Sequence, residues 1–226
     1  TWVETQSPAK LSRYKVAVLA DAWSLAPREV DMIREWVRAG GVLIATGGTS
    51  RHDQWDRPLS NYALADVFGV NFVRGELRGD EATMHKYVEM HIAPTSGVEA
   101  IAIGNRQLLK HMEGVKAVEQ VRALGCDIVT PGTAEVLAMW PDGAPAVTEN
   151  AFGKGRCLFI SPVWPALNCV TRKWTVEDLY KDFGPGVREL LAGCVRRGLE
   201  LAGSELPVEA PGLDKRVELV LKTQES

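Results

Sequence analysis

The chain has 226 residues, of which 46% are hydrophobic and 24% are charged, and its net charge is −3. These proportions are typical of a folded domain with a core and exclude a disordered or collagen-like chain. Its apolar runs stop well short of the ~20 residues that span a bilayer. Because its basic residues form no block, we expect neither nucleic acid nor a membrane as a partner.

The first half of the chain alternates short buried strands with an amphipathic helix. Residues 14–20 form a valine-rich apolar run, which is typical of a buried strand. A helix is then predicted from Pro27, with apolar side chains at helical spacing, to the glycine pair at 40–41. Residues 42–46 form a second buried strand, so this order predicts a βαβ unit with parallel strands.

Further along, the pattern predicts antiparallel strands and one late helix. The spacing of apolar residues indicates a short helix that Asn61 caps and Gly69 ends. The other expected elements are a half-exposed strand at 84–92, a candidate strand at 116–124, a hairpin at 134–149, a buried strand at 157–161 and a helix from 184 onward. We therefore expect an α/β sheet with added antiparallel strands.

The final stretch is organised differently. Prolines and a glycine at 207–212 indicate a linker, and residues 216–222 alternate like a strand and then end. A strand needs a partner for its backbone groups. We therefore expect residues 1–205 to be one α/β domain, and 206–226 to be a linker and the truncated first strand of a following β domain, in a piece of a longer protein.

The cysteines carry little functional information. They are widely spaced, none belongs to a CxxC pair, and three disulfide pairings are open: the four are Cys126, Cys157, Cys169 and Cys194. We expect free thiols that act as small core residues. Free thiols suit a reducing compartment, which favours a cytoplasmic location.

Several segments of the sequence together resemble the β-galactosidase trimerisation domain. They are residues 14–19, 25, 33–45, 61–70 and the turn and strand that begin at Phe152. The resemblance covers residues 10–205, and the tail at 215–222 resembles the opening strand of the small β domain that follows in such enzymes. The family has a class I glutamine-amidotransferase-like, flavodoxin-like fold, in which a mostly parallel sheet is flanked by helices.

The resemblance implies a function outside catalysis. We expect an oligomerisation or accessory domain of a larger carbohydrate-active, β-galactosidase-like protein, with a homo-trimer as the assembly. The parent protein is then expected to be a glycoside hydrolase, and any carbohydrate ligand would come through that enzyme. We expect no cofactor.

The residues at the expected active-site turn support this interpretation. Amidotransferase relatives place a cysteine nucleophile at a sharp turn after a strand, and a histidine and an acid follow later in the chain. At the matching turn Thr46 takes the place of the cysteine and is followed by Gly47 and Gly48, and the later segment at Ser161 has no histidine. We therefore expect a degenerate elbow and no catalytic residue in this chain.

Aromatic and polar residues near the strand ends leave alternatives open. Indole rings stack on sugars and also anchor protein interfaces, and Trp23, Trp55 and Trp164 fall near this edge. His52 and Asp53, in the 47–60 loop, could reach a neighbouring subunit's active site or simply be solvated. The alternatives are a sugar or small-molecule site in this cleft, and an amidotransferase-like hydrolase with an altered nucleophile.

One cluster has the residue types of a metal site. His85, Glu89 and His91 share a face of the strand predicted at 84–92 and could ligate zinc. Paired histidines on a wet strand face are more often solvated or interface residues. We therefore expect no metal in this chain.

Overall fold

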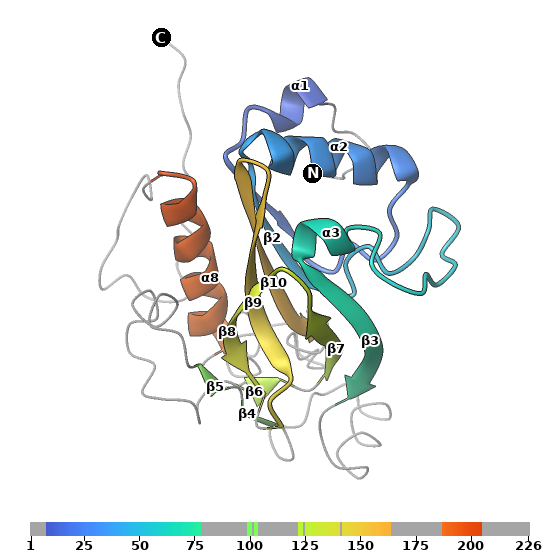
Figure 1. Cartoon of the computed structure of the whole chain (residues 1–226), viewed down its shortest axis with the longest axis vertical. Helices are drawn as coiled ribbons and strands as arrows, with labels where there is room; N and C mark the ends of the chain where they lie inside the picture. The colour runs from blue at the N-terminus through green and yellow to red at the C-terminus, as the bar shows by residue number, and fades with distance from the viewer. Residues whose placement is uncertain are drawn as a thin grey trace, which may run out of the picture.

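The computed structural model describes residues 8–77, 99–100, 102–103, 122–123, 125–140, 142–163 and 187–204. The strand predicted at 84–92, most of the one at 116–124, and the linker and tail at 206–226 lie outside these residues. Within the described part, a mixed sheet carries helices on both faces (Figure 1). None of the described helices is both long enough and apolar enough to cross a membrane.

The βαβ unit, the hairpin and the late helix predicted from the sequence are all present. In chain order the elements are α1 (Pro8–Leu11), β1 (Val16–Leu19), α2 (Pro27–Ala39), β2 (Val42–Gly47), α3 (Ala65–Phe68), β3 (Val70–Leu77), β4 (Glu99–Ala100), β5 (Ala102–Ile103), β6 (Arg122–Ala123), β7 (Gly125–Pro131), β8 (Glu135–Met139), β9 (Pro145–Phe152), β10 (Gly155–Val163) and α8 (Val187–Leu201). The main sheet has the order β1-β2-β10-β9-β8-β5, and β7 joins β3 to β10.

Parallel pairing joins β1, β2 and β10. Ile44 of β2 lies opposite Val18 of β1 on one side and Leu158 of β10 on the other. The pairs β10–β9, β9–β8, β8–β5, β10–β7 and β7–β3 are antiparallel. Short turns link β8 to β9 and β9 to β10, and a short turn can only reverse the chain. The described sheet is therefore mixed, and the expectation of a mostly parallel sheet holds only for β1, β2 and β10.

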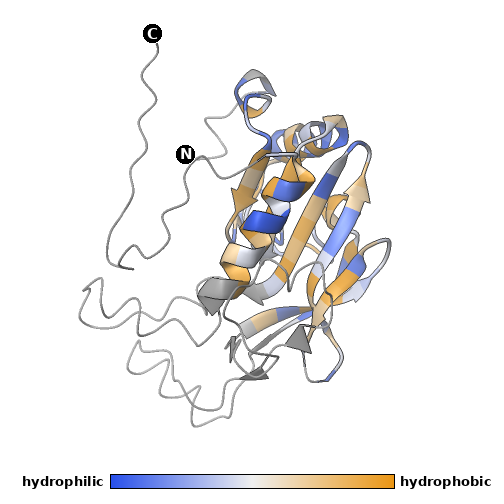
Figure 2. Cartoon of the chain, turned by 90° about the vertical axis from the view of Figure 1, so that its left-hand side faces the viewer, coloured by the Kyte–Doolittle hydropathy of each residue, from blue (hydrophilic) through white to orange (hydrophobic). Residues whose placement is uncertain are grey.

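The central strands are buried on both faces, with side chains that alternate between two cores. Leu43 and Phe159 pack with residues of α2 and α3, whereas Ile44 and Leu158 pack with residues of α8. All four side chains are at most 2% exposed. Figure 2 shows the strands of the sheet largely in hydrophobic colours, as expected where helices cover both faces.

The start of β10 packs directly on the end of α2. A Cβ atom at Gly155 would lie 2.1 Å from the carbonyl oxygen of Val37 and 2.3 Å from that of Gly41, so only glycine fits there. Gly40 ends α2 with φ 126°, as the glycine pair predicted. The C-terminal end of α2 and the start of β10 are therefore fixed to each other by backbone contact.

The region around the short helix differs from its prediction. Leu64, not Asn61, is the N-cap of α3, and the Asn61 side chain instead accepts the backbone N–H of Phe72 at 2.9 Å. Gly69 ends this helix in the left-handed conformation with φ 69°, as predicted. The chain then continues directly as β3, a strand that the sequence pattern did not reveal.

The described cysteines are core residues. Cys126, Cys157 and Cys194 are buried and form no disulfide, which confirms the expectation for these three. Cys169 lies outside the described residues.

Two of the tryptophans are core residues as well. Trp36 and Trp140 are buried, at 9% and 1% exposed.

Candidate functional site

The turn after β2 forms the centre of the candidate site. Residues 47–50 are all buried, and Gly48 has a positive φ of 83°. The Thr49 hydroxyl donates to the carbonyl oxygen of Leu19 at 3.2 Å, and the Ser50 N–H donates to that of Ala22 at 2.8 Å. A sharp turn therefore stands where the sequence predicted an elbow, but neighbouring loops cover it.

The Thr46 side chain is fully engaged by Asp21. Its hydroxyl donates to Asp21 Oδ1 at 2.9 Å and accepts the Asp21 backbone N–H at 2.8 Å. Thr46 is 1% exposed. A threonine nucleophile needs an accessible hydroxyl and a base that takes its proton, usually an imidazole or an amine. Neither condition is met by the described contacts of Thr46, which supports the interpretation of a degenerate elbow.

The indole of Trp23 lies over the glycine of this turn. A Cβ atom at Gly48 would lie 2.6 Å from Trp23 Cε3, so the ring occupies the space that a side chain would need. The indole also stacks on the imidazole of His52, with ring centroids 5.1 Å apart and an interplanar angle of 13°. Trp23 is still 43% exposed. Trp23 therefore separates the turn from solvent.

A buried acid reaches the same turn from β7. Oδ2 of Asp127 accepts the Gly48 N–H at 2.8 Å and the Tyr62 hydroxyl at 2.7 Å. Asp127 is 5% exposed and Tyr62 is 4% exposed. Burial raises the pKa of Tyr62 well above its ordinary value, and the Asp127 carboxylate raises it further, so the phenol stays protonated. The sequence analysis did not identify Asp127. An acidic residue between Cys126 and the apolar pair Ile128-Val129 could have indicated a buried carboxylate with hydrogen-bond partners.

The first part of the 47–60 loop is tied to the loop that follows β1. The backbone N–H of His52 donates to the Trp23 carbonyl at 3.0 Å, and the Leu25 N–H donates to the His52 carbonyl at 3.3 Å. Ser24 Oγ donates to Asp56 Oδ1 at 3.0 Å. His52 thus lies at the edge of this turn, and it is held there through its backbone and the stacked Trp23 ring.

The tip of this loop is a turn that displays a tryptophan. Asp53 Oδ1 accepts the backbone N–H groups of Trp55 at 2.8 Å and Arg57 at 2.9 Å. The bond from Arg57, together with that from Trp55, lowers the pKa of Asp53. Asp53 therefore shapes the turn, while Trp55 is 70% exposed. This leaves Trp55 free to contact a partner.

The remaining candidates do not join this cluster. Ser161 is fully buried on β10, where its Oγ accepts the indole N–H of Trp140 at 3.1 Å. Trp164 lies outside the described residues, as do the metal candidates His85, Glu89 and His91. Across the described residues, no group of three histidine, cysteine, aspartate or glutamate side chains could hold a metal ion.

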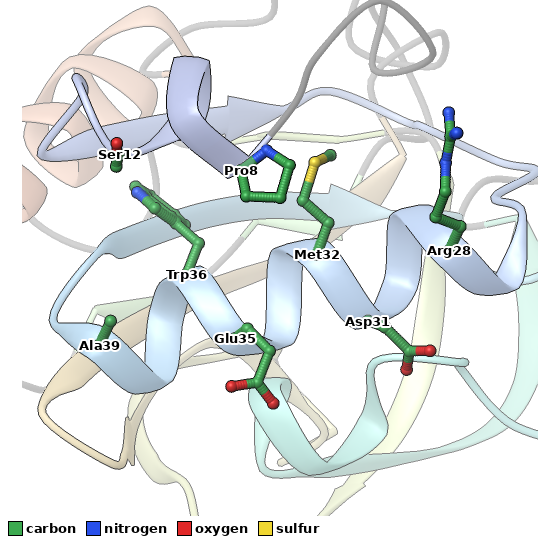
Figure 3. Close-up of a pocket in the computed structure, with 8 residues that line it drawn as sticks. All are labelled: Pro8, Ser12, Arg28, Asp31, Met32, Glu35, Trp36 and Ala39. Carbon is green, nitrogen blue, oxygen red and sulfur yellow. The ribbon is translucent and has the colours of Figure 1, made fainter.

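A separate pocket of about 580 Å³ lies between α1 and the outer face of α2 (Figure 3). Met32 and Trp36 point toward α1 and provide apolar surface, whereas Asp31 and Glu35, which also line the pocket, extend from the side of the helix away from α1. Trp36 donates its indole N–H to the Tyr14 carbonyl at 3.2 Å. The pocket is a groove on the helix surface and shares no residue with the strand-end site.

One family is identified by the comparisons with known proteins. The model of the β-galactosidase trimerisation domain matches residues 4–183. A search of curated proteins finds no match. Similar solved structures include the β-galactosidase of Bacillus circulans sp. alkalophilus, which is 19% identical with a TM-score of 0.62 over 88% of this chain and 24% of that one. The β-galactosidase of the haloarchaeon Halorubrum lacusprofundi is 16% identical with a TM-score of 0.54, over 84% and 22% of the two chains.

A third similar structure is closer to this chain in size. A cytoplasmic protein from Salmonella typhimurium is 14% identical with a TM-score of 0.55, over 86% of this chain and 76% of that one. At such identities the structures show the fold alone, and this chain spans about a quarter of the Bacillus enzyme. The family model covers most of the sequence, and on that ground the chain belongs to the β-galactosidase trimerisation domain family.

Proposed function

We propose that this chain is a non-catalytic oligomerisation domain of a larger, β-galactosidase-like glycoside hydrolase, and that it assembles as a homo-trimer. Its family membership supports the assembly, and the greater length of the similar β-galactosidases supports the larger parent protein. The buried turn supports the proposal that the domain is non-catalytic, because the Thr46 hydroxyl is hydrogen-bonded to Asp21 and Trp23 lies over the adjacent Gly48. Buried free thiols favour a cytoplasmic location.

The domain organisation follows from the same proposal. Parallel strands β1, β2 and β10 with helices on both faces support a flavodoxin-like, class I amidotransferase-like core with added antiparallel strands. We assign residues 1–205 to this domain. Residues 206–226, outside the described part, would begin the following β domain.

The 47–60 loop is the surface that we assign to contact with a neighbouring subunit. Trp55 is 70% exposed at its tip, and the Asp53 turn and the Ser24–Asp56 hydrogen bond hold the loop in place. A large exposed ring on an ordered loop loses little conformational entropy when it docks. Trp55 is therefore well suited to anchor an interface or to line the mouth of a neighbour's active site.

The solution mass of the 226-residue chain tests this proposal. We expect three times the chain mass by light scattering at high micromolar concentration, and a shift toward monomer for Trp55→Ala. Met139→Ala is the matched control, because Met139 is also exposed, at 42%, but lies on β8. A strict monomer at high micromolar concentration would contradict the assembly, and an unchanged trimer in Trp55→Ala would exclude this loop.

A sugar site at the same loop is the second candidate. The exposed rings of Trp23 and Trp55 favour it, since indoles stack on sugar rings. Titration with galactose and lactose, followed by tryptophan fluorescence in the wild type and Trp55→Ala, distinguishes the two functions. A saturable response that Trp55→Ala removes would support a sugar site, whereas an interface role predicts no response. A hydrolase would instead show glutaminase or esterase turnover that Thr46→Ala removes.

A further inference from the structure

One buried carboxylate oxygen connects three separate parts of the chain. Oδ2 of Asp127 accepts hydrogen bonds from the Gly48 N–H at 2.8 Å and the Tyr62 hydroxyl at 2.7 Å, and Asp127 lies 79 residues beyond Gly48. The three residues come from the β2 turn, the loop before α3, and β7. Both donors point to the position of a single anionic oxygen.

The surroundings of this oxygen favour negative charge. Gly48 has φ 83°, and turn amides next to a residue with positive φ commonly form concave sites for anions. The Arg51 guanidinium lies 5.6 Å from the ring centre of Tyr62 and 3.2 Å from that of Phe72. Hydrogen bonds to an ionised acceptor are about twice as strong as those between neutral groups. A turn amide and a phenol, with a guanidinium close to the phenol ring, are groups that suit an anionic acceptor.

We propose that the β2 turn is a binding site for a small carboxylate, and that the chain fills this site itself with the side chain of Asp127. The side chain stands where a free anion would otherwise bind. Asp127 occupies both donors and Trp23 fills the space where a Gly48 side chain would lie, so the site is already filled in the intact protein. The inference concerns the chemistry of the turn and does not depend on trimer formation.

Removal of the resident carboxylate should leave the site vacant for a free one. Asp127→Ala keeps the Gly48 and Tyr62 donors and opens space next to them. The probe is formate, compared with chloride at equal ionic strength, and the readout is the thermal midpoint of the 226-residue chain. We expect formate to raise the midpoint of Asp127→Ala by about 3 °C or more, in a saturable manner, because a ligand that binds only the folded state stabilises it. The wild type should respond equally to both salts.

Two variants serve as controls. Asp127→Asn keeps a polar group in the site and should show no formate-specific gain. Tyr62→Phe keeps the carboxylate and should also respond equally to formate and chloride. Exchange of the Gly48 amide proton gives a local readout, since this proton should exchange slowly in the wild type, faster in Asp127→Ala, and slowly again when formate is added.

Every outcome bears on the proposal. If Asp127→Ala is unfolded in chloride, folding that appears only in formate supports the site, and a chain unfolded in both salts overturns it. Equal midpoints in the two salts, or an equal formate gain in the wild type, also overturn it. The oligomeric mass plays no part in these readouts, so failure here is distinguishable from failure of the proposed assembly.

Discussion

The guanidinium of Arg197 on α8 donates two hydrogen bonds to the Glu149 carboxylate on β9, at 2.9 and 3.2 Å. The two side chains are 14% and 12% exposed, so this ion pair lies mostly out of water. Burial alone would lower the pKa of Arg197, but its hydrogen bonds to Glu149 and Glu200 outweigh burial and raise it. The pair fastens the late helix to the sheet beside an apolar core.

Loss of this pair should destabilise the fold. Arg197→Ala leaves the mostly buried Glu149 carboxylate without two hydrogen bonds, and we expect a loss of about 2 kcal/mol in the free energy of unfolding by urea. The control is Glu35→Ala, which removes the 70% exposed partner of Arg38 and should cost less than about 0.5 kcal/mol. Equal losses in both variants would show that burial of the pair has no effect.

The second prediction concerns alkaline pH. Because the folded state raises the pKa of Tyr62, folding keeps a proton that the unfolded chain releases above about pH 10. This contribution to stability is complete below pH 10 and is lost as the pH rises further. We expect the free energy of unfolding to fall more steeply between pH 9 and 11 in the wild type than in Tyr62→Phe. Stability profiles of the wild type and Tyr62→Phe that run parallel between pH 9 and 11 would contradict this prediction.

Absorbance at 295 nm provides an independent check of the same residue. In the folded protein at pH 11, Tyr62 should remain un-ionised, so the tyrosinate signal should rise further on addition of denaturant. Tyr62→Phe should lower the denatured signal and leave the folded signal unchanged. A folded signal that falls in this variant would mean that Tyr62 titrates normally.

The third prediction concerns thiol reactivity. Burial raises the pKa of Cys194 to about 12, and it also raises that of Cys157. Since the thiolate is the reactive form, neither residue should react with a disulfide reagent while the protein is folded. We expect the fast labelling amplitude to be the same in wild type, Cys157→Ser and Cys194→Ser, and urea to expose both thiols. A drop in the fast amplitude in either variant would contradict this.

The fourth prediction tests the contact between α2 and β10. Gly155→Ala would push a methyl group against two carbonyl oxygens, and we expect a loss of about 3 kcal/mol in the free energy of unfolding. Gly143→Ala is the control, since Gly143 has φ 86° but no atom within 4 Å of a new Cβ, so only backbone strain of about 1 kcal/mol applies. The order of the two midpoints in urea checks the prediction, and the reverse order would refute it.

The βαβ unit was predictable because its signals are local. The apolar runs that became β1 and β2, Pro27 at the helix start and Gly40 at its end can all be recognised without tertiary information. The burial predicted for the first run was wrong, because β1 ends the order of the described sheet and leaves Val18 53% exposed. β3 could not be predicted in this way, because Asn71 and Arg74 interrupt its apolar residues. Its pairing with β7 shifts register between Phe72 and Arg74, so tertiary contacts decide its structure.

The candidate site shows the same division. The position of the turn and the absence of a cysteine or histidine follow from residues that are close in the sequence. The contact between Asp127 and Gly48 depends on β7 reaching this edge through its pairing with β3 and β10, and no short-range pattern encodes that. The position of the Trp23 ring also depends on a residue distant in the sequence, because the ring occupies the space that a Cβ atom of Gly48 would need.

The Asp21–Thr46 pair also bears on any attempt to engineer activity into this domain. A cysteine introduced at position 46 would sit next to a carboxylate, which disfavours the thiolate that attacks a substrate. Such a redesign would have to neutralise position 21, shrink the indole at position 23 and supply an imidazole. A single Thr46→Cys substitution would give an inert thiol.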